Sequence, residues 1–339
     1  TLELAREILA RVATRAIRRP IAEAELVPYL PHVDERLKAG RDFDDSLQDR
    51  LTAVLCSPNY IYLREESGGA ERPISDYDHA SRLAYFLTSS MPDEALIDLA
   101  SAAKLADPGV LLDQVERLLD GPGGERFVRR FVAQWLHLRE IEDTTPDRKL
   151  YPDFDELLQV SMVAEGEAFF HHLLDEDLPI RNFLNSDFAM LNGRLAEHYG
   201  IEGVEGWGLR PVKLPGDSVR GGVLTQAGVL KVTANGTNTS PVLRGIWVLE
   251  NILGMSSPPP PPNVAGIEPD IRGATTIREQ LDRHRDAESC AVCHRSIDPP
   301  GFALESFDPV GDWRDHYRRF VVSNAEKGWG SVQDGAVVD

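Results

Sequence analysis

Cys290-Ala291-Val292-Cys293-His294 is the stretch around which we expect the whole chain to be organised. Two thiols three positions apart, with an imidazole directly after the second, are what covalent attachment of a c-type haem requires. On a helical turn the two sulfurs lie close enough to bond both vinyl groups of one porphyrin, while the imidazole turns toward the iron. The sequence therefore predicts one covalent haem c per chain, bound by Cys290 and Cys293, with His294 as the proximal iron ligand.

Two other interpretations of the cysteine pair stay open. A structural zinc site needs two further ligands at comparable spacing. Only nearby histidines could supply them, since the remaining cysteine, Cys56, lies far upstream. A dithiol redox motif is expected beside a βαβ pattern, which the sequence does not display. We expect Cys56 to be a buried helical thiol, because it ends an apolar helical stretch.

The distal side of the iron decides between electron transfer and peroxide chemistry, because a saturated iron favours outer-sphere transfer and an open one binds small ligands. No methionine follows Met255, so the downstream methionine usual in small cytochromes c is absent. The candidates for the distal ligand are His284, His316 and Met255.

Residues around the motif are predicted to support the haem. Guanidinium groups pair well with carboxylates, which predicts propionate partners at Arg285, Arg295 and Arg314. A backbone carbonyl within residues 298–302 is expected to accept the N–H of His294 and so to set its tautomer.

The composition is that of an ordinary globular protein, with 42% apolar and 27% charged residues among 339. The 36 basic and 55 acidic residues give a net charge of −19. This charge excludes non-specific binding to nucleic acid or to an anionic membrane surface, and it favours a basic electron-transfer partner or a neutral substrate. No apolar run approaches the roughly 18 to 20 residues of a membrane span, so we expect none in this chain.

Helical periodicity dominates the rest of the sequence, with almost no alternating strand pattern. We expect a mainly α fold, a multi-helix array followed by a small helical c-type cytochrome-like segment. Glycines 68–69 and the proline run 258–262, a stiff spacer, divide the chain. The predicted domains are 1–67, 72–219 and 220–339. The clearest predicted helices cover 2–18, 22–38, 43–56, 76–87, 110–119, 125–138, 154–174 and 240–253.

The predicted helix 154–174 contains four groups that bear on chemistry: Glu165, Glu167, His171 and His172. Glu167 and His171 are four residues apart and so share a face, which suits a metal site or a proton relay. An ordinary solvated charge pair is the alternative, and it is favoured because no second carboxylate–histidine set appears elsewhere.

Four blocks of the sequence together resemble a family of large exported proteins, the planctomycete cytochrome-like proteins, which are assembled from successive domains of unknown function. The blocks share short patterns spread over almost the whole chain. They are Ala5-Arg6-Glu7-Ile8-Leu9, Ala80-Ser81-Arg82-Leu83-Ala84-Tyr85-Phe86-Leu87, Thr239-Ser240-Pro241-Val242 with Trp247-Val248-Leu249-Glu250-Asn251, and Cys290 to His294 with Ile297-Asp298-Pro299 and Gly311-Asp312-Trp313-Arg314. The resemblance implies a covalent haem, an extracytoplasmic location, and a central segment of a longer protein whose other haem domains are redox partners.

The leading functional hypothesis is an exported c-type haem module that transfers electrons, linked to an oxidative process outside the cytoplasm. A haem peroxidase or oxidase with an open distal site is the second hypothesis. A non-redox helical binding scaffold with a structural metal is the third. The partner is expected to be a redox protein or another haem domain of the full-length protein, and not nucleic acid.

Overall fold

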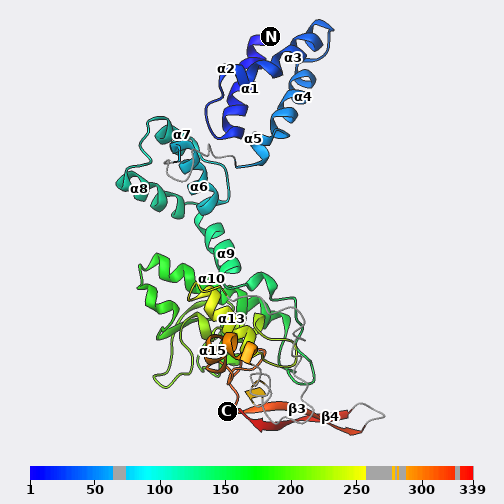
Figure 1. Ribbon diagram of the computed structural model, residues 1–339, viewed down its shortest axis with the longest axis vertical. Helices are drawn as coiled ribbons and strands as arrows, with labels where there is room; N and C mark the ends of the chain where they lie inside the picture. Colours follow the sequence, from blue (N-terminus) through cyan, green and yellow to red (C-terminus); the bar gives the residue numbers. More distant parts are fainter. Residues whose placement is uncertain (64–73, 257–276, 279–280, 282–287, 325–328, 339) are drawn as a thin grey trace. The chain divides into compact units, whose positions relative to one another are not determined.

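The computed structural model describes residues 1–63, 74–256, 277–278, 281, 288–324 and 329–338, with the backbone alone for 288–290, 324 and 329. The chain forms two compact units, Thr1–Phe127 and Val128–Asp339 (Figure 1). Most of the regular structure is helical, which confirms the expected mainly α fold. The division into three domains stays a prediction. None of the described helices is both long and apolar enough to cross a membrane.

The first unit opens with short helices packed around a stripe of small apolar residues. These helices are α1 (Leu2–Ile17), α2 (Glu23–Leu26), α3 (Leu30–Lys38), α4 (Phe43–Leu55) and α5 (Pro58–Ile61). Ala5, Leu9 and Ala13 recur every four residues on α1 and are fully buried. The predicted helix 22–38 is interrupted by a 3-10 turn, because Pro28 and Pro31 have no N–H to donate to a continuous helix.

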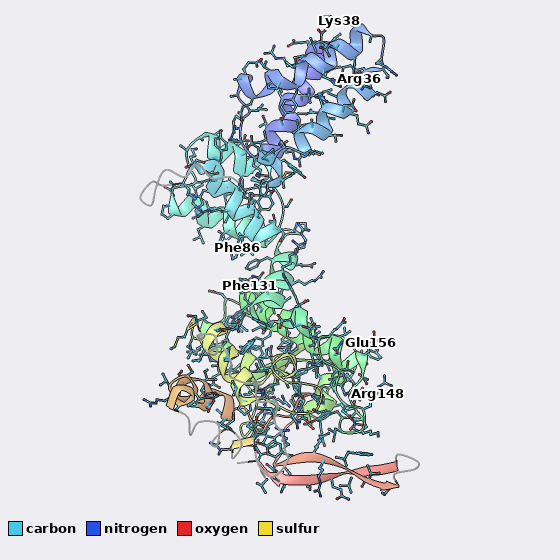
Figure 2. The ribbon with its side chains drawn as sticks, turned by 45° about the vertical axis from the view of Figure 1, so that its right-hand side comes forward. Arg36, Lys38, Phe86, Phe131, Arg148 and Glu156 are labelled. Atoms are coloured by element: carbon cyan, nitrogen blue, oxygen red, sulfur yellow. The ribbon has the colours of Figure 1, made fainter. Side chains whose placement is uncertain are left out.

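The remainder of this unit is also helical. The elements are α6 (Asp76–Thr88), α7 (Glu94–Ser101), α8 (Pro108–Leu119) and the beginning of α9 (Gly124–Trp135). Ser75 and Asp93 accept backbone hydrogen bonds at the N-termini of α6 and α7. Phe86 of α6, labelled in Figure 2, packs edge-on against Phe127 with 5.2 Å between ring centroids.

Cys56 is exposed, so the prediction of a buried thiol is wrong. It follows the last residue of α4 as the C-cap. The buried face of α4 includes Val54. Cys56 comes two positions later, which is about 200° further around the helix axis, and so lies on the opposite side.

The second unit packs helices around a small antiparallel pair of strands. Its elements are α10 (Glu156–Asp175), β1 (Phe188–Leu191), α11 (Gly193–Tyr199), β2 (Arg210–Lys213), α12 (Ala227–Val232), α13 (Pro241–Asn251) and α15 (Glu288–Phe302). Leu158 and Met162 of α10 form the centre of the core together with Leu191 and Leu195. Ser240 caps α13 and Pro241 follows at its first position, at the start of the helix predicted over 240–253.

A β-hairpin ends the described chain, and the sequence did not predict it. Strands β3 (His316–Asn324) and β4 (Trp329–Val337) pair antiparallel, with Phe320 opposite Val332. The period-2 pattern is weak because polar and charged residues interrupt both strands, and valines such as Val322 and Val337 are exposed. Main-chain pairing decides the structure here more than apolar alternation does.

Candidate functional site

The helix that carries the cysteine motif, α15, crosses α13 with the two backbones in direct contact. A Cβ atom placed on Gly245 of α13 would lie 1.9 Å from the carbonyl oxygen of Ile297, and one on Gly301 of α15 would lie 1.8 Å from the carbonyl oxygen of Pro241. No side chain fits at either position. The two glycines therefore determine how closely the motif helix packs on the rest of the unit.

The cysteine motif lies within a single helix, as expected. Residues 290, 293 and 294 fall within α15, at positions i, i+3 and i+4, which share a helix face. Cys293 is a free thiol of intermediate exposure. The side chain of Cys290 lies outside the described part of the structure.

The His294 side chain is held by a carboxylate one helical turn further on. Its Nδ1 lies 2.8 Å from Oδ1 of Asp298, and the two side chains are 13% and 1% exposed. A carboxylate accepts hydrogen bonds, so this contact assigns the hydrogen to Nδ1 and leaves the lone pair on Nε2. The sequence predicted a backbone carbonyl in this role, and the structure has the Asp298 side chain there.

These residues fit a c-type haem by the chemistry of the donor set. A thiol three residues from another and an imidazole that carries its hydrogen on Nδ1 are the groups that thioether attachment and axial iron ligation need. A carboxylate on the other ring nitrogen is the usual support of a metal-binding histidine. The hydrogen bond to Asp298 is the structural observation that supports the fit.

A buried polar network holds the segment that follows α15. The Arg244 guanidinium of α13 donates 2.6 Å hydrogen bonds to the carbonyls of Leu304 and Phe307, and a third, of 3.1 Å, to that of Asp308. Burial lowers the pKa of Arg244 to about 10, and the nearby Glu305 carboxylate opposes this. One side chain thus holds three backbone carbonyls within residues 304–308 against α13.

Glu305 is the acceptor at the other end of this network. Its Oε1 accepts hydrogen bonds from Arg314 at 2.9 Å, from Tyr317 at 3.2 Å, and from the Thr239 hydroxyl. Glu305 is 1% and Arg314 is 6% exposed. The pair is a buried ion pair with additional hydrogen bonds, the form in which buried charges are tolerated.

The other predicted site residues lie in different surroundings. Met255 follows α13 and is 52% exposed, and His316 begins β3. Arg295 is exposed on α15, whereas Arg314 is engaged with Glu305. His284 and Arg285 lie outside the described residues. Their roles as distal ligands or propionate partners stay predictions.

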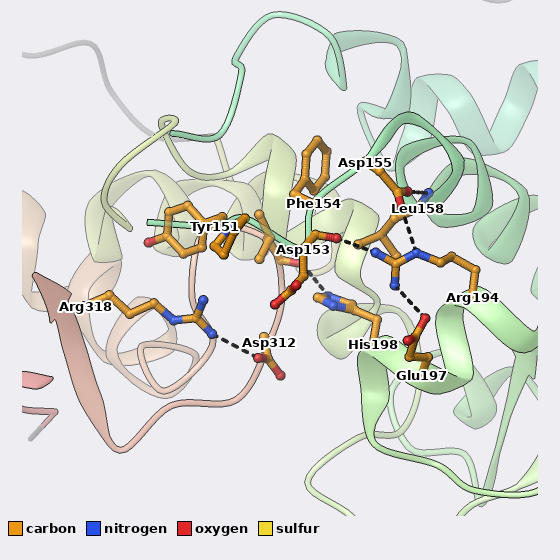
Figure 3. A pocket seen from close by; sticks show the side chains of 12 residues that line it. Tyr151, Asp153, Phe154, Asp155, Leu158, Arg194, Glu197, His198, Asp312 and Arg318 are labelled. Carbon is orange, nitrogen blue, oxygen red and sulfur yellow. Dashed lines mark hydrogen bonds and ion pairs between the residues drawn. The ribbon is translucent and has the colours of Figure 1, made fainter. Parts of the chain in front are cut away.

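A polar cleft of about 610 Å³ lies in the same unit, and no pattern in the sequence pointed to it. Figure 3 shows Arg194 of α11 reaching Asp155 and Glu197, with N···O distances of 3.1 and 3.4 Å. On the opposite wall Arg318 pairs with Asp312 at 3.2 Å. The cleft unites residues more than a hundred positions apart in sequence, which is why only the folded chain reveals it.

The cleft has a neutral histidine and internally paired charges. His198 Nε2 lies 2.8 Å from the Val310 carbonyl, and burial lowers the pKa of this imidazole to about 4. A carbonyl only accepts, so Nε2 carries the hydrogen. Because both arginines are bound to carboxylates, the charges of the two walls are compensated locally. The hydrogen bond from His198 to Val310 joins α11 to the loop after α15.

The carboxylate–histidine cluster of α10 does not form the shared site considered above. Glu167 lies 3.9 Å from Arg129, and His171 Nδ1 lies 2.5 Å from Asp175. The ring of His172 packs against Phe188. Each side chain has its own partner, in keeping with the alternative of ordinary surface pairing.

Glu165 of the same helix is instead buried in the core. It is 1% exposed, and the Tyr199 hydroxyl donates a 2.6 Å hydrogen bond to its Oε2. Burial raises the pKa of Glu165 to about 7, although the hydrogen bond from Tyr199 and the charge of Arg220 lower it. The guanidinium of Arg220 lies 3.6 Å from the centre of the Tyr199 ring.

Replacing Glu165 by glutamine is expected to remove a pH-dependent loss of stability. Below a pH of about 4.5 the Glu165 carboxyl is protonated in both the folded and the unfolded protein. Between about 4.5 and 7 the unfolded state ionises first, so the folded unit loses up to about 3 kcal/mol as the pH rises. Glu165→Gln keeps an acceptor for Tyr199 and cannot ionise. Urea unfolding between pH 5 and 8, followed by tryptophan fluorescence, measures the difference.

The exposed Glu202→Gln in the same unit is the matched control and should retain the parent's pH dependence. All five tryptophans lie after residue 127, so their fluorescence reports the second unit alone. An unchanged slope in Glu165→Gln contradicts the prediction.

Three family models match the chain in succession. Residues 4–65 match PSD5, a protein of unknown function (DUF1595). Residues 74–201 match PSD4, a protein of unknown function (DUF1592), and residues 220–317 match PSCyt3, a protein of unknown function (DUF1588). Among curated proteins and solved structures no match is found. The three matches together cover most of the sequence in the order that the resemblance predicted, and the chain belongs to the planctomycete cytochrome-like family of multi-domain proteins.

Proposed function

We propose that this chain is a c-type haem module that transfers electrons outside the cytoplasm. The observation that carries the proposal is the His294–Asp298 hydrogen bond within the helix of the cysteine motif, because a carboxylate on Nδ1 is a common support of a metal-binding histidine. The matched model over residues 220–317 supports it, because its printed name, PSCyt3, points to cytochrome-like domains.

The chain's own residues have distinct tasks in this proposal. A bound haem supplies a one-electron iron couple. The thiols of Cys290 and Cys293 would hold the haem covalently, and His294 would hold its iron. Gly245 and Gly301 keep the helix at a fixed distance from α13, so that the donor groups are held on one rigid element.

The partner is a redox protein or another haem domain of the full-length protein. The net charge of −19 favours a partner with a basic docking surface, since opposite potentials speed encounter. Attachment of haem to this motif takes place outside the cytoplasm in bacteria, which supports a periplasmic or secreted location.

The double variant Cys290→Ala/Cys293→Ala is expected to lose all covalently bound haem. The protein is produced in a bacterial periplasm with haem-maturation machinery, extracted with acid acetone, and assayed for haem that stays with the polypeptide. We expect the parent to retain one haem per chain, with an absorption spectrum that changes on reduction.

Cys56→Ala is the matched control, because it removes an exposed thiol from the other unit and should leave the haem content unchanged. A colourless parent overturns the proposal, and zinc by elemental analysis then favours the structural-metal hypothesis. A high-spin ferric spectrum with rapid peroxide reaction favours the peroxidase hypothesis over electron transfer.

A further inference from the structure

The environment of the His294–Asp298 pair differs from that of a second pair with the same spacing. His171 and Asp175 of α10 are also four residues apart, with 2.5 Å between Nδ1 and Oδ2, but their side chains are 46% and 54% exposed. The side chains of His294 and Asp298 in α15 are 13% and 1% exposed. Of these two pairs, only His294–Asp298 lies largely out of water.

Burial determines how strongly the carboxylate acts on the ring. Water and salt screen the charge of an exposed carboxylate, so it acts only weakly on a neighbouring ring. At lower effective dielectric the same carboxylate charge acts on the ring several times more strongly. Asp298 therefore polarises its imidazole far more than Asp175 does.

The backbone around Asp298 is held by the crossing of the two helices. The preceding residue, Ile297, is 6% exposed, and its carbonyl lies against Gly245. Pro299 and Pro300 follow within the helix and restrict the backbone on the other side. The carboxylate is thus positioned by rigid elements on both sides, as a residue that orients a ligand should be.

We propose that Asp298 is a positioning residue that holds the Nδ1–H of His294 and lowers the reduction potential of the iron bound at Nε2. The proposal rests on the haem-binding function above. A negative charge on the far side of the ring makes the imidazole a stronger donor, which stabilises the oxidised iron relative to the reduced iron. A neutral backbone carbonyl in the same place has a weaker effect. The module is accordingly an electron donor to partners of higher potential.

The isosteric variant Asp298→Asn tests this inference. Its amide oxygen still accepts the hydrogen bond, but the charge is removed. We expect the ratio of reduced to oxidised protein at a fixed applied potential to rise about tenfold, which is a midpoint shift of about +59 mV. The measurement is a spectroelectrochemical titration of the haem-loaded chain.

Asp175→Asn is the control, because it neutralises a carboxylate on a histidine at the same spacing, and its midpoint should equal that of the parent. A haem-bearing Asp298→Asn with the parent's midpoint overturns the inference and leaves the proposed function intact. A parent without covalent haem overturns both.

A measurement on the unmodified parent covers the case in which Asp298→Asn does not fold. With ¹⁵N-labelled histidine in the reduced protein, the His294 Nδ1–H is expected to exchange slowly with water, because a buried carboxylate accepts it. The exposed His171 is the internal reference. Exchange of the His294 proton as fast as that of His171 overturns the inference.

Discussion

Arg244→Leu is expected to destabilise the second unit by about 3–5 kcal/mol, the largest effect of any single substitution considered for this chain. The guanidinium is fully buried and donates hydrogen bonds to the carbonyls of Leu304, Phe307 and Asp308. Leucine fills part of the volume but leaves these acceptors without a donor, and it leaves Glu305 with one positive neighbour fewer. Urea unfolding followed by tryptophan fluorescence gives the free energy.

Arg148→Leu is the control, since Arg148 is exposed in the same unit (Figure 2) and its loss should change the free energy of unfolding by less than about 0.5 kcal/mol. Arg244→Lys should recover only part of the loss, because an ammonium group lacks the planar fork that reaches several carbonyls. A change of less than about 1 kcal/mol in Arg244→Leu contradicts the prediction.

Gly245→Ala is expected to cost about 3 kcal/mol, at the upper end of what inserting one methyl group into a packed core costs. The added Cβ would meet the Ile297 carbonyl oxygen at 1.9 Å. A backbone atom cannot move aside as a side chain does, so α13 and α15 must separate. The same separation disturbs the helix of the cysteine motif, and a lower yield of covalent haem should accompany the lower urea midpoint.

Gly208→Ala provides the matched comparison. Its Cβ would meet nothing within 4 Å, so the substitution should be neutral or stabilise the unit by a few tenths of a kcal/mol through the unfolded chain. Equal urea midpoints for Gly245→Ala and the parent would show that the two helices do not pack as tightly as described.

The features that the sequence predicted are those decided within a few residues. The starts of the helices predicted over 76–87 and 240–253 follow from Ser75 and Ser240, whose side chains cap the next turn. The cysteine motif needs only one turn of helix to bring its groups to one face. The overall helical class follows from repeated 3.6-residue periodicity, which reports burial directly.

The structure differs from the predictions where the local sequence pattern and the three-dimensional context disagree. The helix expected over 22–38 is divided, because two prolines interrupt an otherwise amphipathic stretch. Cys56 ends an apolar helix and yet faces water. The hairpin of β3 and β4 was not predicted, because its stability comes from pairing between strands with little apolar alternation.

By itself the sequence determined the helical class and the family, and it predicts which residues bind a haem, because each of these depends on neighbours along the chain. Only the tertiary structure decided which of those residues are buried and what they contact. Any helix would bring Asp298 and His294 to one face, because they are four residues apart. The crossing of α15 with α13 at Gly245 removes the pair from water. The Arg244 and Glu305 networks and the cleft at His198 join distant segments, and their electrostatics depend on burial that no local pattern records.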